Sequence, residues 1–399
     1  MGMVAKVVAA MERVLGEGLN ALAKEHKVIR RERKFSGESL LRMLVLTLLK
    51  KPGATFSDLA LTAAQWDVPV SATAVEKRFT QSLVDFLREV LGEALKELVA
   101  AEPTSVELLQ RFTAVFIGDS SSIALPDKWQ TLFPGCGGTE GSGEAALKLQ
   151  VRWNWKTGER PLLLIEAGRA SDAKSEIIQQ GQAIELRRWL ATHTQTNVID
   201  RPILLGTHER FPCRLIGVRL TPEAANRRRQ KARENAVRHG RTASAEDLEQ
   251  LGWSLVVTNL TTEKLTWKEA IVLYRARWQI ERLFKLWKSH NRLAQHRRGA
   301  TPEEALAVLW AKLIGILLQH WRLLSATWPD DRRSLLNAAR ALRDWITCLI
   351  IALDNHDQLV STVTKLHSHL NHAAKTQSRK IKTRHYQLLQ KPERLDGAA

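Results

Sequence analysis

The chain has 399 residues, which is too long for one ordinary hydrophobic core and predicts two or three domains. Its 60 Lys and Arg residues outnumber 42 Asp and Glu residues, and the formal net charge of +18 predicts a surface that attracts a polyanion, with nucleic acid as the first candidate. A membrane protein is not expected, because the most apolar stretches, 305–318 and 345–353, are shorter than the roughly 18 residues that span a bilayer and are interpreted as buried helices.

The first part of the chain, residues 1–108, is expected to be helical. Apolar residues at helical spacing predict helices over 4–23, 39–50, 56–66, 71–81 and 83–98. Ser71 suits the N-cap of the fourth helix, since it follows a break around Pro69. The two helices beside this break resemble a DNA-binding helix-turn-helix, although an ordinary helical bundle has the same pattern. The basic cluster at 30–34 is interpreted as a loop that can contact phosphate.

Strand patterns follow the helical part. Apolar or alternating runs predict strands over 112–118, 147–155 and 161–168, and the first run stops at Asp119. The glycine-rich stretch 135–143 lacks the Lys-Ser or Lys-Thr of a phosphate-binding loop and is expected to be a flexible loop. Three successive strands with an acid at the end of the first are similar to the opening of a ribonuclease H-like fold.

The remaining elements alternate between basic and apolar segments. A helix is predicted over 175–191 and strands over 198–206 and 213–220, followed by a dense basic block at 227–241 that suits a helix or a disordered arm on DNA phosphate. Residues 291–399 are expected to be helical, with the longest helix at 302–324. The basic tail of this region contains Lys375, Arg379, Lys380, Lys382 and Arg384. His367, His369 and His372 are interpreted as solvated side chains.

The segment 274–288 is the most informative one. A straight helix with about 100° per residue places four functional groups in one narrow stripe: Tyr274, Arg277, Glu281 and Lys288. Apolar side chains lie opposite this stripe. One acid flanked by phosphate-binding groups suits a metal-dependent enzyme that acts on a nucleic-acid backbone. On spacing alone, the charged and solvated face of an ordinary amphipathic helix is the commoner explanation.

The surrounding residues resemble those of a known family. Together with the strand-like run 253–259, the spacing Tyr274-x2-Arg277-x3-Glu281-x6-Lys288 is similar to the signature of bacterial insertion-sequence DDE transposases of insertion sequence family four, named for Tyr-Arg-Glu-Lys. Asp119, with the following Ser-Ser-Ser-Ile-Ala-Leu-Pro, resembles the family's first catalytic aspartate, and Glu281 resembles its glutamate. The resemblance covers residues 30 to about 328.

This resemblance implies an α/β fold with a ribonuclease H-like catalytic core, in which helices flank a mixed sheet. The implied domains are a helical DNA-binding region at 1–108, the core at 109–325 with a strand-rich insertion at about 192–258, and a helical, basic region at 326–399. The implied partners are double-stranded DNA, both the terminal inverted repeats of the element and the target, and a second copy of the chain as a homodimer on DNA.

The implied chemistry is metal-dependent cleavage and strand transfer. Phosphodiester cleavage is an in-line displacement that two Mg²⁺ ions about 4 Å apart promote, and carboxylate oxygens hold such ions. The resemblance assigns this role to Asp119 and Glu281, with Mn²⁺ as an alternative to Mg²⁺. It assigns phosphate contacts at the element end to Tyr274, Arg277 and Lys288. Without the resemblance, Asp119 would be read as a surface acid and Glu281 as a partner in a helix salt bridge.

The second catalytic aspartate of the family has no counterpart. The family carries it at the end of a further strand, in a segment that would fall near 180–188, and no Asp-x-Gly-aromatic sequence occurs in this chain. An internal deletion around that aspartate is the simplest account. Asp172 resembles a non-catalytic segment of the family. Asp200 is a candidate substitute, if the shortened chain folds it next to Asp119.

Three functions remain open from the sequence. The first is a transposase whose activity is impaired by the missing aspartate. The second is a catalytically inactive DNA-binding relic or dominant-negative regulator of transposition, and the third is a ribonuclease H-like nuclease with another substrate. The first residues lack the layout of a signal peptide, and the three cysteines are too scattered for a disulfide framework, so a cytoplasmic, nucleoid-associated protein of a bacterium is expected.

Overall fold

The structure is a computed structural model and describes residues 2–16, 18–30, 34–97, 99–101, 106–131, 133–135, 145–158, 162–168, 177–179, 182–184, 186–192, 195–205, 210–297, 299–327, 334–374 and 385–395. The glycine-rich stretch after residue 135, Asp172 and the basic tail 375–384 lie outside the described residues. The chain forms two units. The larger unit consists of Met1–Ser105, Leu109–Ala170 and Trp278–Arg379, and the smaller unit of Val106–Leu108, Ser171–Arg277 and Lys380–Ala399.

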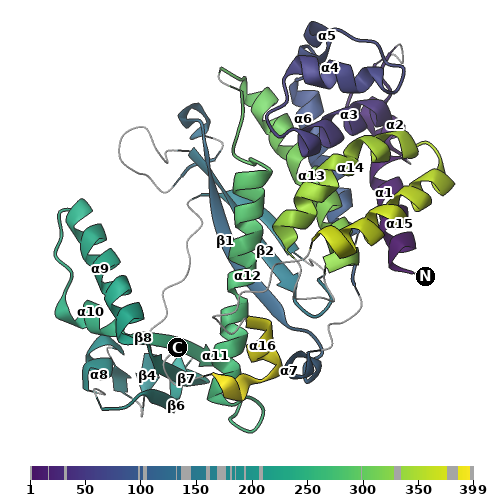
Figure 1. Ribbon diagram of the computed structural model, residues 1–399. Helices are drawn as coiled ribbons and strands as arrows, with labels where there is room; N and C mark the ends of the chain where they lie inside the picture. Colours follow the sequence, from purple (N-terminus) through teal and green to yellow (C-terminus); the bar gives the residue numbers. More distant parts are fainter. Residues whose placement is uncertain are drawn as a thin grey trace. The chain divides into compact units, whose positions relative to one another are not determined.

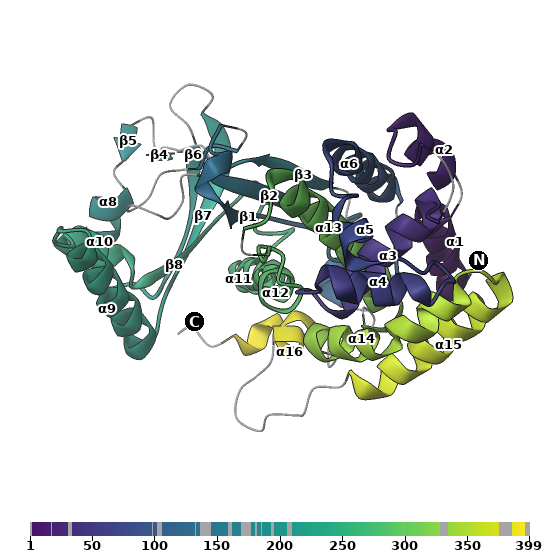
Figure 2. The ribbon, with the colours of Figure 1, turned by 90° about the horizontal axis from the view of Figure 1, so that it is seen from above.

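Helices from both ends of the chain pack together in the larger unit (Figures 1 and 2). The first part forms α1 (Met3–Leu15), α2 (Leu19–Glu25), α3 (Gly37–Lys50), α4 (Phe56–Ala64), α5 (Ala72–Glu76), α6 (Gln81–Lys96) and α7 (Glu107–Gln110). The last part forms α13 (Pro302–Thr327), α14 (Leu335–Ala352) and α15 (His356–Ala373). The central α13 contacts α3 and α6, while α14 contacts α3 and α15 contacts α1. Helices of the expected regions 1–108 and 326–399 therefore share one core.

Local sequence explains most of these helix boundaries. Ser36 and Thr55 form capping boxes at α3 and α4, and Ser71 accepts a hydrogen bond from the backbone N–H of Ala74, which confirms it as the N-cap of α5. The single helix predicted over 4–23 is wrong. The chain breaks after Leu15, where Gly16 is the C-cap of α1, and Gly18, the N-cap of α2, adopts a positive φ of 80° that favours glycine.

The long helix α13 is a core helix. By length and apolarity it could cross a membrane, but 94% of its apolar window is buried inside the protein. Its buried polar side chains include Lys312 and Arg322, which are 3% and 2% exposed. The interpretation of 305–318 and 345–353 as buried helical segments is therefore confirmed, since α14 contributes the buried Ile346, Leu349 and Ile350.

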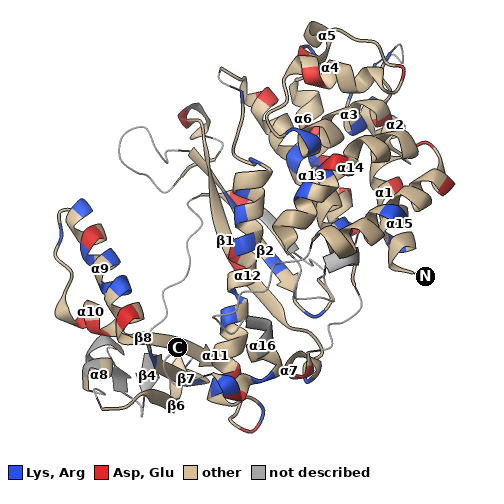
Figure 3. Cartoon of the chain, in the orientation of Figure 1, with Lys and Arg blue, Asp and Glu red and all other residues tan. Residues whose placement is uncertain are grey.

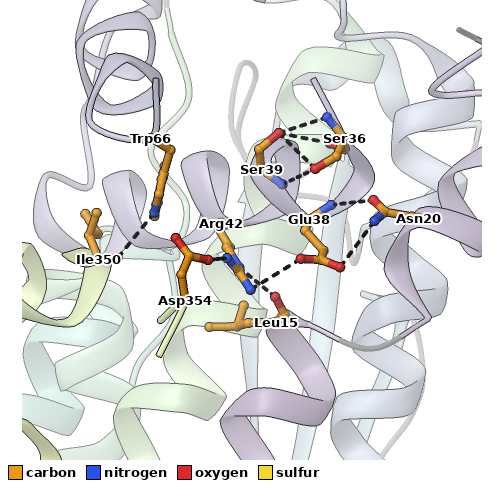
Figure 4. A network of polar contacts seen from close by, with 9 residues as sticks. All are labelled: Leu15, Asn20, Ser36, Glu38, Ser39, Arg42, Trp66, Ile350 and Asp354. Carbon is orange, nitrogen blue, oxygen red and sulfur yellow. Dashed lines mark hydrogen bonds and ion pairs between the residues drawn. The ribbon is translucent and has the colours of Figure 1, made fainter. Parts of the chain in front are cut away.

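A buried arginine joins the two ends of the chain in the larger unit (Figure 4). Arg42 on α3 donates a hydrogen bond from Nε to the carbonyl oxygen of Leu15 at 2.8 Å and from Nη1 to Asp354 Oδ1 at 2.5 Å. Glu38, one turn earlier on α3, lies 3.4 Å from the same guanidinium group. A second link is the hydrogen bond from the Trp66 indole to the carbonyl oxygen of Ile350 at 3.2 Å.

The larger unit also holds a three-stranded antiparallel sheet in the order β1-β2-β3. Its strands are β1 (Phe116–Leu125), β2 (Ala145–Asn154) and β3 (Leu162–Ala167), and a short 3-10 helix (Asp127–Trp129) follows β1. The strands predicted over 147–155 and 161–168 are confirmed. The first prediction is wrong in its bounds, because β1 continues through Asp119 and pairs along its whole length with β2.

The smaller unit contains a five-stranded antiparallel sheet in the order β5-β4-β6-β7-β8. Its strands are β4 (Ile177–Gln179), β5 (Gln182–Ile184), β6 (Val198–Leu205), β7 (Phe211–Arg219) and β8 (Trp253–Thr258). Its helices are α8 (Leu186–Thr192), α9 (Pro222–Arg238), α10 (Ala245–Gln250), α11 (Trp267–Ala276) and α16 (His385–Gln390), with a 3-10 turn at Pro392–Arg394.

The smaller unit confirms the strands predicted over 198–206, 213–220 and 253–259 and shows the basic block as a helix, α9. The helix predicted over 175–191 is wrong for its first half, where β4 and β5 form a hairpin and Ile177 pairs with Leu205 of β6. Pairing of β-branched residues with an existing strand outweighs the local helical pattern there. The α/β class is confirmed, while all described strands are antiparallel.

Candidate active site

The first carboxylate lies in the middle of β1. Because side chains alternate along a strand, Asp119 faces the same side as Ile117 and Ile123, which are 7% and 1% exposed. The residue opposite Asp119 on β2 is Val151, which is 2% exposed. The Asp119 carboxylate itself is half-buried and accepts a hydrogen bond from the backbone N–H of Ser120 at 2.9 Å.

An acid on such a face is unusual for a purely structural strand. A carboxylate surrounded by apolar side chains must be hydrogen-bonded, ion-paired or bound to a cation, because its desolvation is otherwise expensive. The same face of β1 also carries Ser121, so polar groups interrupt the apolar face at two successive inward positions. This pattern fits a site in which Asp119 acts on a ligand.

The second carboxylate lies on a helix that packs against β1. α12 (Trp278–Lys285) contacts β1 and buries Ile280, Leu283 and Phe284, while Glu281 is half-buried. Both elements belong to the larger unit. The structure therefore brings the helix of Glu281 and the strand of Asp119 together, as the resemblance implies.

The segment 274–288 is helical as expected, but it is not one regular helix. α11 ends at Ala276, Arg277 is its C-cap, and after α12 the chain forms a π-helical turn, η2 (Leu286–His290). The backbone N–H of Asn291 donates to the carbonyl oxygen of Leu286 at 3.0 Å, five residues back, which is the π-type bond. The wider turn changes the direction of Lys288 relative to the stripe calculated for a regular helix.

Lys288 reaches the edge strand of the sheet. Its Nζ donates a hydrogen bond to the carbonyl oxygen of Ser122 at 2.6 Å, so it ties η2 to β1 three residues beyond Asp119. The side chain remains exposed, but its ammonium group lies against the strand, and burial lowers the pKa of Lys288 below its ordinary value. The lysine thus has a partner inside the larger unit as well as an exposed surface.

The other two signature residues belong to the smaller unit. Tyr274 on α11 is 44% exposed, and the guanidinium carbon of Arg277 lies 5.8 Å from the centre of its ring. Trp278, the next residue, is 62% exposed. A phenol and a guanidinium group on one exposed patch can donate hydrogen bonds to phosphate, but the four signature residues are divided between the two units.

Asp200 already has a partner in the smaller unit. It lies on β6 opposite Ile216, and its Oδ1 is 2.8 Å from Arg214 Nε, with side chains that are 22% and 11% exposed. Arg214 also donates hydrogen bonds to the carbonyl oxygens of Leu260 at 2.9 Å and Leu265 at 2.5 Å. This ion pair joins β6 and β7 and gives Asp200 a role in stabilising the five-stranded sheet.

The described residues contain no group of three or more His, Cys, Asp and Glu side chains that could hold a metal ion. The donors that remain are the carboxylates of Asp119 and Glu281. Two hard oxygen ligands fit Mg²⁺ in their chemistry, because this ion retains several water molecules and is often held by one or two carboxylates. The residues present therefore fit one ion better than the pair of ions used in two-metal displacement.

The basic helix α9 is partly engaged within its own unit. Arg228 donates a hydrogen bond to the carbonyl oxygen of Trp253, and Arg229 binds the carbonyl oxygen of Leu248 and the carboxylate of Glu249. Other Lys and Arg residues line its exposed length (Figure 3). The helix can thus be held to β8 and α10 by some of its cations and offer the rest to an anion.

Comparisons with known proteins place the chain among transposases. A family model described as a transposase DDE domain matches residues 112–318. The chain is similar to the transposase for insertion sequence element IS231F of Bacillus thuringiensis subsp. israelensis, with 24% identity over 425 residues that cover 88% of this chain and 87% of the relative. It is also similar to the transposase for IS1151 of Clostridium perfringens, with 23% identity over 372 residues that cover 75% of this chain and 76% of that protein. A shorter match, 38% identical over 108 residues and covering 27% of this chain and 29% of the relative, is to the transposase for IS421 of Escherichia coli. The family model covers more than half of the sequence and includes both Asp119 and Glu281, so the chain belongs to the transposase DDE domain family and is an insertion-sequence transposase by descent.

Proposed function

We propose that the protein binds the ends of an insertion sequence of the family-four type, and that its cleavage and strand transfer are impaired because the second catalytic aspartate is missing. The observation that carries this proposal is the packing of β1, with Asp119 on its apolar face, against α12, with Glu281.

Asp119 and Glu281 would hold a divalent cation, Mg²⁺ or in its place Mn²⁺. When bound, the cation would polarise the scissile phosphate and neutralise charge that develops on the leaving oxygen. Lys288 orients η2 on β1 through its bond to Ser122, and so positions the helix that carries Glu281. Tyr274 and Arg277 would donate hydrogen bonds to phosphates at the element end.

Two observations support an internal deletion. Within the described residues β1 pairs with β2 only, so the other edge of the strand that bears Asp119 carries no strand. The alignment with the IS231F transposase runs over 425 positions, whereas 88% of 399 residues is about 351, which leaves some 74 positions without a counterpart in this chain. A lost strand beside β1, together with the aspartate at its end, accounts for both observations.

The alternative function is a DNA-binding relic or a dominant-negative regulator of transposition. The absence of a third acid near Asp119 and Glu281 among the described residues favours this alternative. Such a protein would retain the contacts of Tyr274, Arg277 and the helices α4 and α5 with DNA and would still form a homodimer on the element ends. Its site of action would be the bacterial cytoplasm, on the nucleoid.

The test is a cleavage assay with Mg²⁺ on DNA that carries the inverted repeats flanking the gene, beside a gel-shift titration of the same DNA. We expect binding, but cleavage slower by roughly a thousandfold or more than that of a complete family member, because the loss of a metal ligand removes several kcal/mol of transition-state stabilisation. Glu281→Gln should remove what cleavage remains and retain binding. Rapid cleavage that is abolished both in Asp119→Ala and in an Asp200→Ala variant of unchanged thermal stability would contradict the deletion and identify Asp200 as the third ligand.

A further inference from the structure

Five basic side chains gather in the larger unit where η2 meets α14. Lys285 ends α12, His290 ends η2, Arg292 follows it, and Arg340 and Arg343 lie three residues apart on α14 and so share one face of that helix. The guanidinium group of Arg343 donates a hydrogen bond to the carbonyl oxygen of His290 and joins the two elements. These five residues are called the α14 basic cluster below.

Within the described part of the chain, the charged groups that shift the pKa values of His290 and Arg343 are all basic. The groups whose charge acts on His290 are Arg340, Arg343 and Lys285, and those that act on Arg343 are Arg292 and Arg340, so every one of them is positive. Burial and this repulsion lower the pKa values of His290 and Arg343. Like charges held together destabilise the folded chain unless an anion lies between them.

The α14 basic cluster begins beside the proposed active site. Lys285 follows Glu281 by four residues on α12, so it lies on the same side of the helix, about 6 Å further along the axis. Arg340 is exposed on the neighbouring helix, and Lys285 and Arg292 are exposed as well. A polyanion bound at Glu281 that extends along α12 toward η2 would therefore reach these cations.

We propose that the α14 basic cluster binds the phosphate backbone of the DNA duplex that leaves the Asp119 and Glu281 site, and so provides a second DNA contact surface on the C-terminal helices. The identity of the ligand rests on the function proposed above. Duplex DNA carries a negative charge about every 1.7 Å of its axis, so a short stretch suffices to neutralise several cations. Backbone contacts of this kind carry no sequence information, and the cluster should bind element ends and unrelated duplexes alike.

The test uses the full-length chain with Lys285→Ala, Arg340→Ala and the double variant. Both side chains are exposed, and the matched control is Lys365→Ala, an exposed lysine on α15 that is not part of the cluster. Affinity for a duplex is measured at several salt concentrations, and thermal unfolding is recorded without DNA. Each cluster variant should lower the slope of log affinity against log salt by about one and weaken binding severalfold at low salt.

Thermal stability separates this role from a structural one. Because the cluster repels itself, Arg340→Ala should leave the melting temperature unchanged or raise it, while binding weakens. The cluster proposal would be overturned if both cluster variants kept the salt slope of the wild type. If the wild type still bound element ends and Arg277→Ala did not, the proposed function would nevertheless stand. An equal loss of slope in Lys365→Ala would also overturn the cluster proposal, and failure of the wild type to bind any duplex would overturn both proposals.

Discussion

The ammonium group of Lys312, inside α13, donates a hydrogen bond to the carbonyl oxygen of Arg292 at 2.8 Å. The same group donates to the carbonyl oxygen of Gln295 at 2.6 Å. Arg292 has a positive φ of 44°, which is unfavourable for a residue with a side chain, so the buried lysine holds a strained turn directly after η2. The position of the signature helix thus depends on a cation in the core of the larger unit.

This buried lysine predicts a dependence of stability on pH. Desolvation by burial, with the nearby Arg292, lowers the pKa of Lys312 from 10.5 to about 8. Between these two values the unfolded chain binds the proton and the folded chain does not, so the free energy of unfolding should rise with pH over this window, by roughly 2 kcal/mol up to pH 10. The measurement is thermal or denaturant unfolding from pH 7 to 10, with Lys312→Met as the control that lacks this rise. If the Lys312→Met variant showed the same rise in the free energy of unfolding, the rise would come from other titrating groups.

Salt should govern DNA binding. With +18 net charge and basic residues on α9 and α12, the protein should neutralise several phosphates and release their counterions. If about six contacts form, affinity should fall by roughly a thousandfold or more between 50 and 200 mM salt. A gel-shift titration measures this, and a flat dependence on salt would contradict the predicted role of the positive surface.

Arg277→Ala should weaken binding to the element end with little effect on folding. The guanidinium group lies beside the exposed ring of Tyr274 and is itself half-buried, so its removal should change the free energy of unfolding by less than about 1 kcal/mol. Lys288→Ala is the informative comparison, because that lysine also bonds to Ser122 and its loss should lower the melting temperature. If the Arg277→Ala variant were unfolded, the prediction would be wrong and Arg277 would have a structural role.

Asp200→Ala distinguishes a structural from a catalytic role for that acid. Removal of one partner of a largely buried ion pair leaves Arg214 uncompensated, which typically costs about 3 kcal/mol or more, and the melting temperature should fall clearly. The double variant Asp200→Ala with Arg214→Met should recover part of the loss. A variant that retains full stability and loses only cleavage would show that Asp200 serves catalysis instead.

The sequence predicted most helices and strands because their signals are local. Ser71 as an N-cap and the strands around 198–206 and 213–220 follow from capping chemistry and alternation alone. The resemblance to a known family, and not spacing alone, singled out Asp119 and Glu281, and their catalytic role stays a prediction. The sequence did not predict the interruption at Arg277 or the π-turn at Leu286–His290. The residues directly after the π-turn are held by contacts distant in sequence, namely those of Lys312 and the hydrogen bond from Asn291 to Gln319 at 2.6 Å.

The position of Asp119 in the strand was also mispredicted for a physical reason. An acid after an apolar run indicates the end of a strand when only one neighbour is considered, but β2 supplies ten paired positions and carries β1 on to Leu125. The sequence signal for the α14 basic cluster is weaker: it consists of two arginines at helical spacing, Arg340 and Arg343. The cluster forms only where α14 meets η2, which lies some fifty residues earlier, so the sequence of α14 alone could not predict it.

The pairing of Arg42 with Asp354 has a consequence for the order in which the chain folds. These residues are 312 positions apart, and the apolar face of α3 packs on α13 and α14, which are synthesised long after it. Contacts so distant in sequence slow folding, and the first helices keep apolar surface exposed until α13 and α14 have been synthesised. Fragments that end before α13 should therefore aggregate or be degraded, and the yield of this protein in a cell should depend strongly on chaperones.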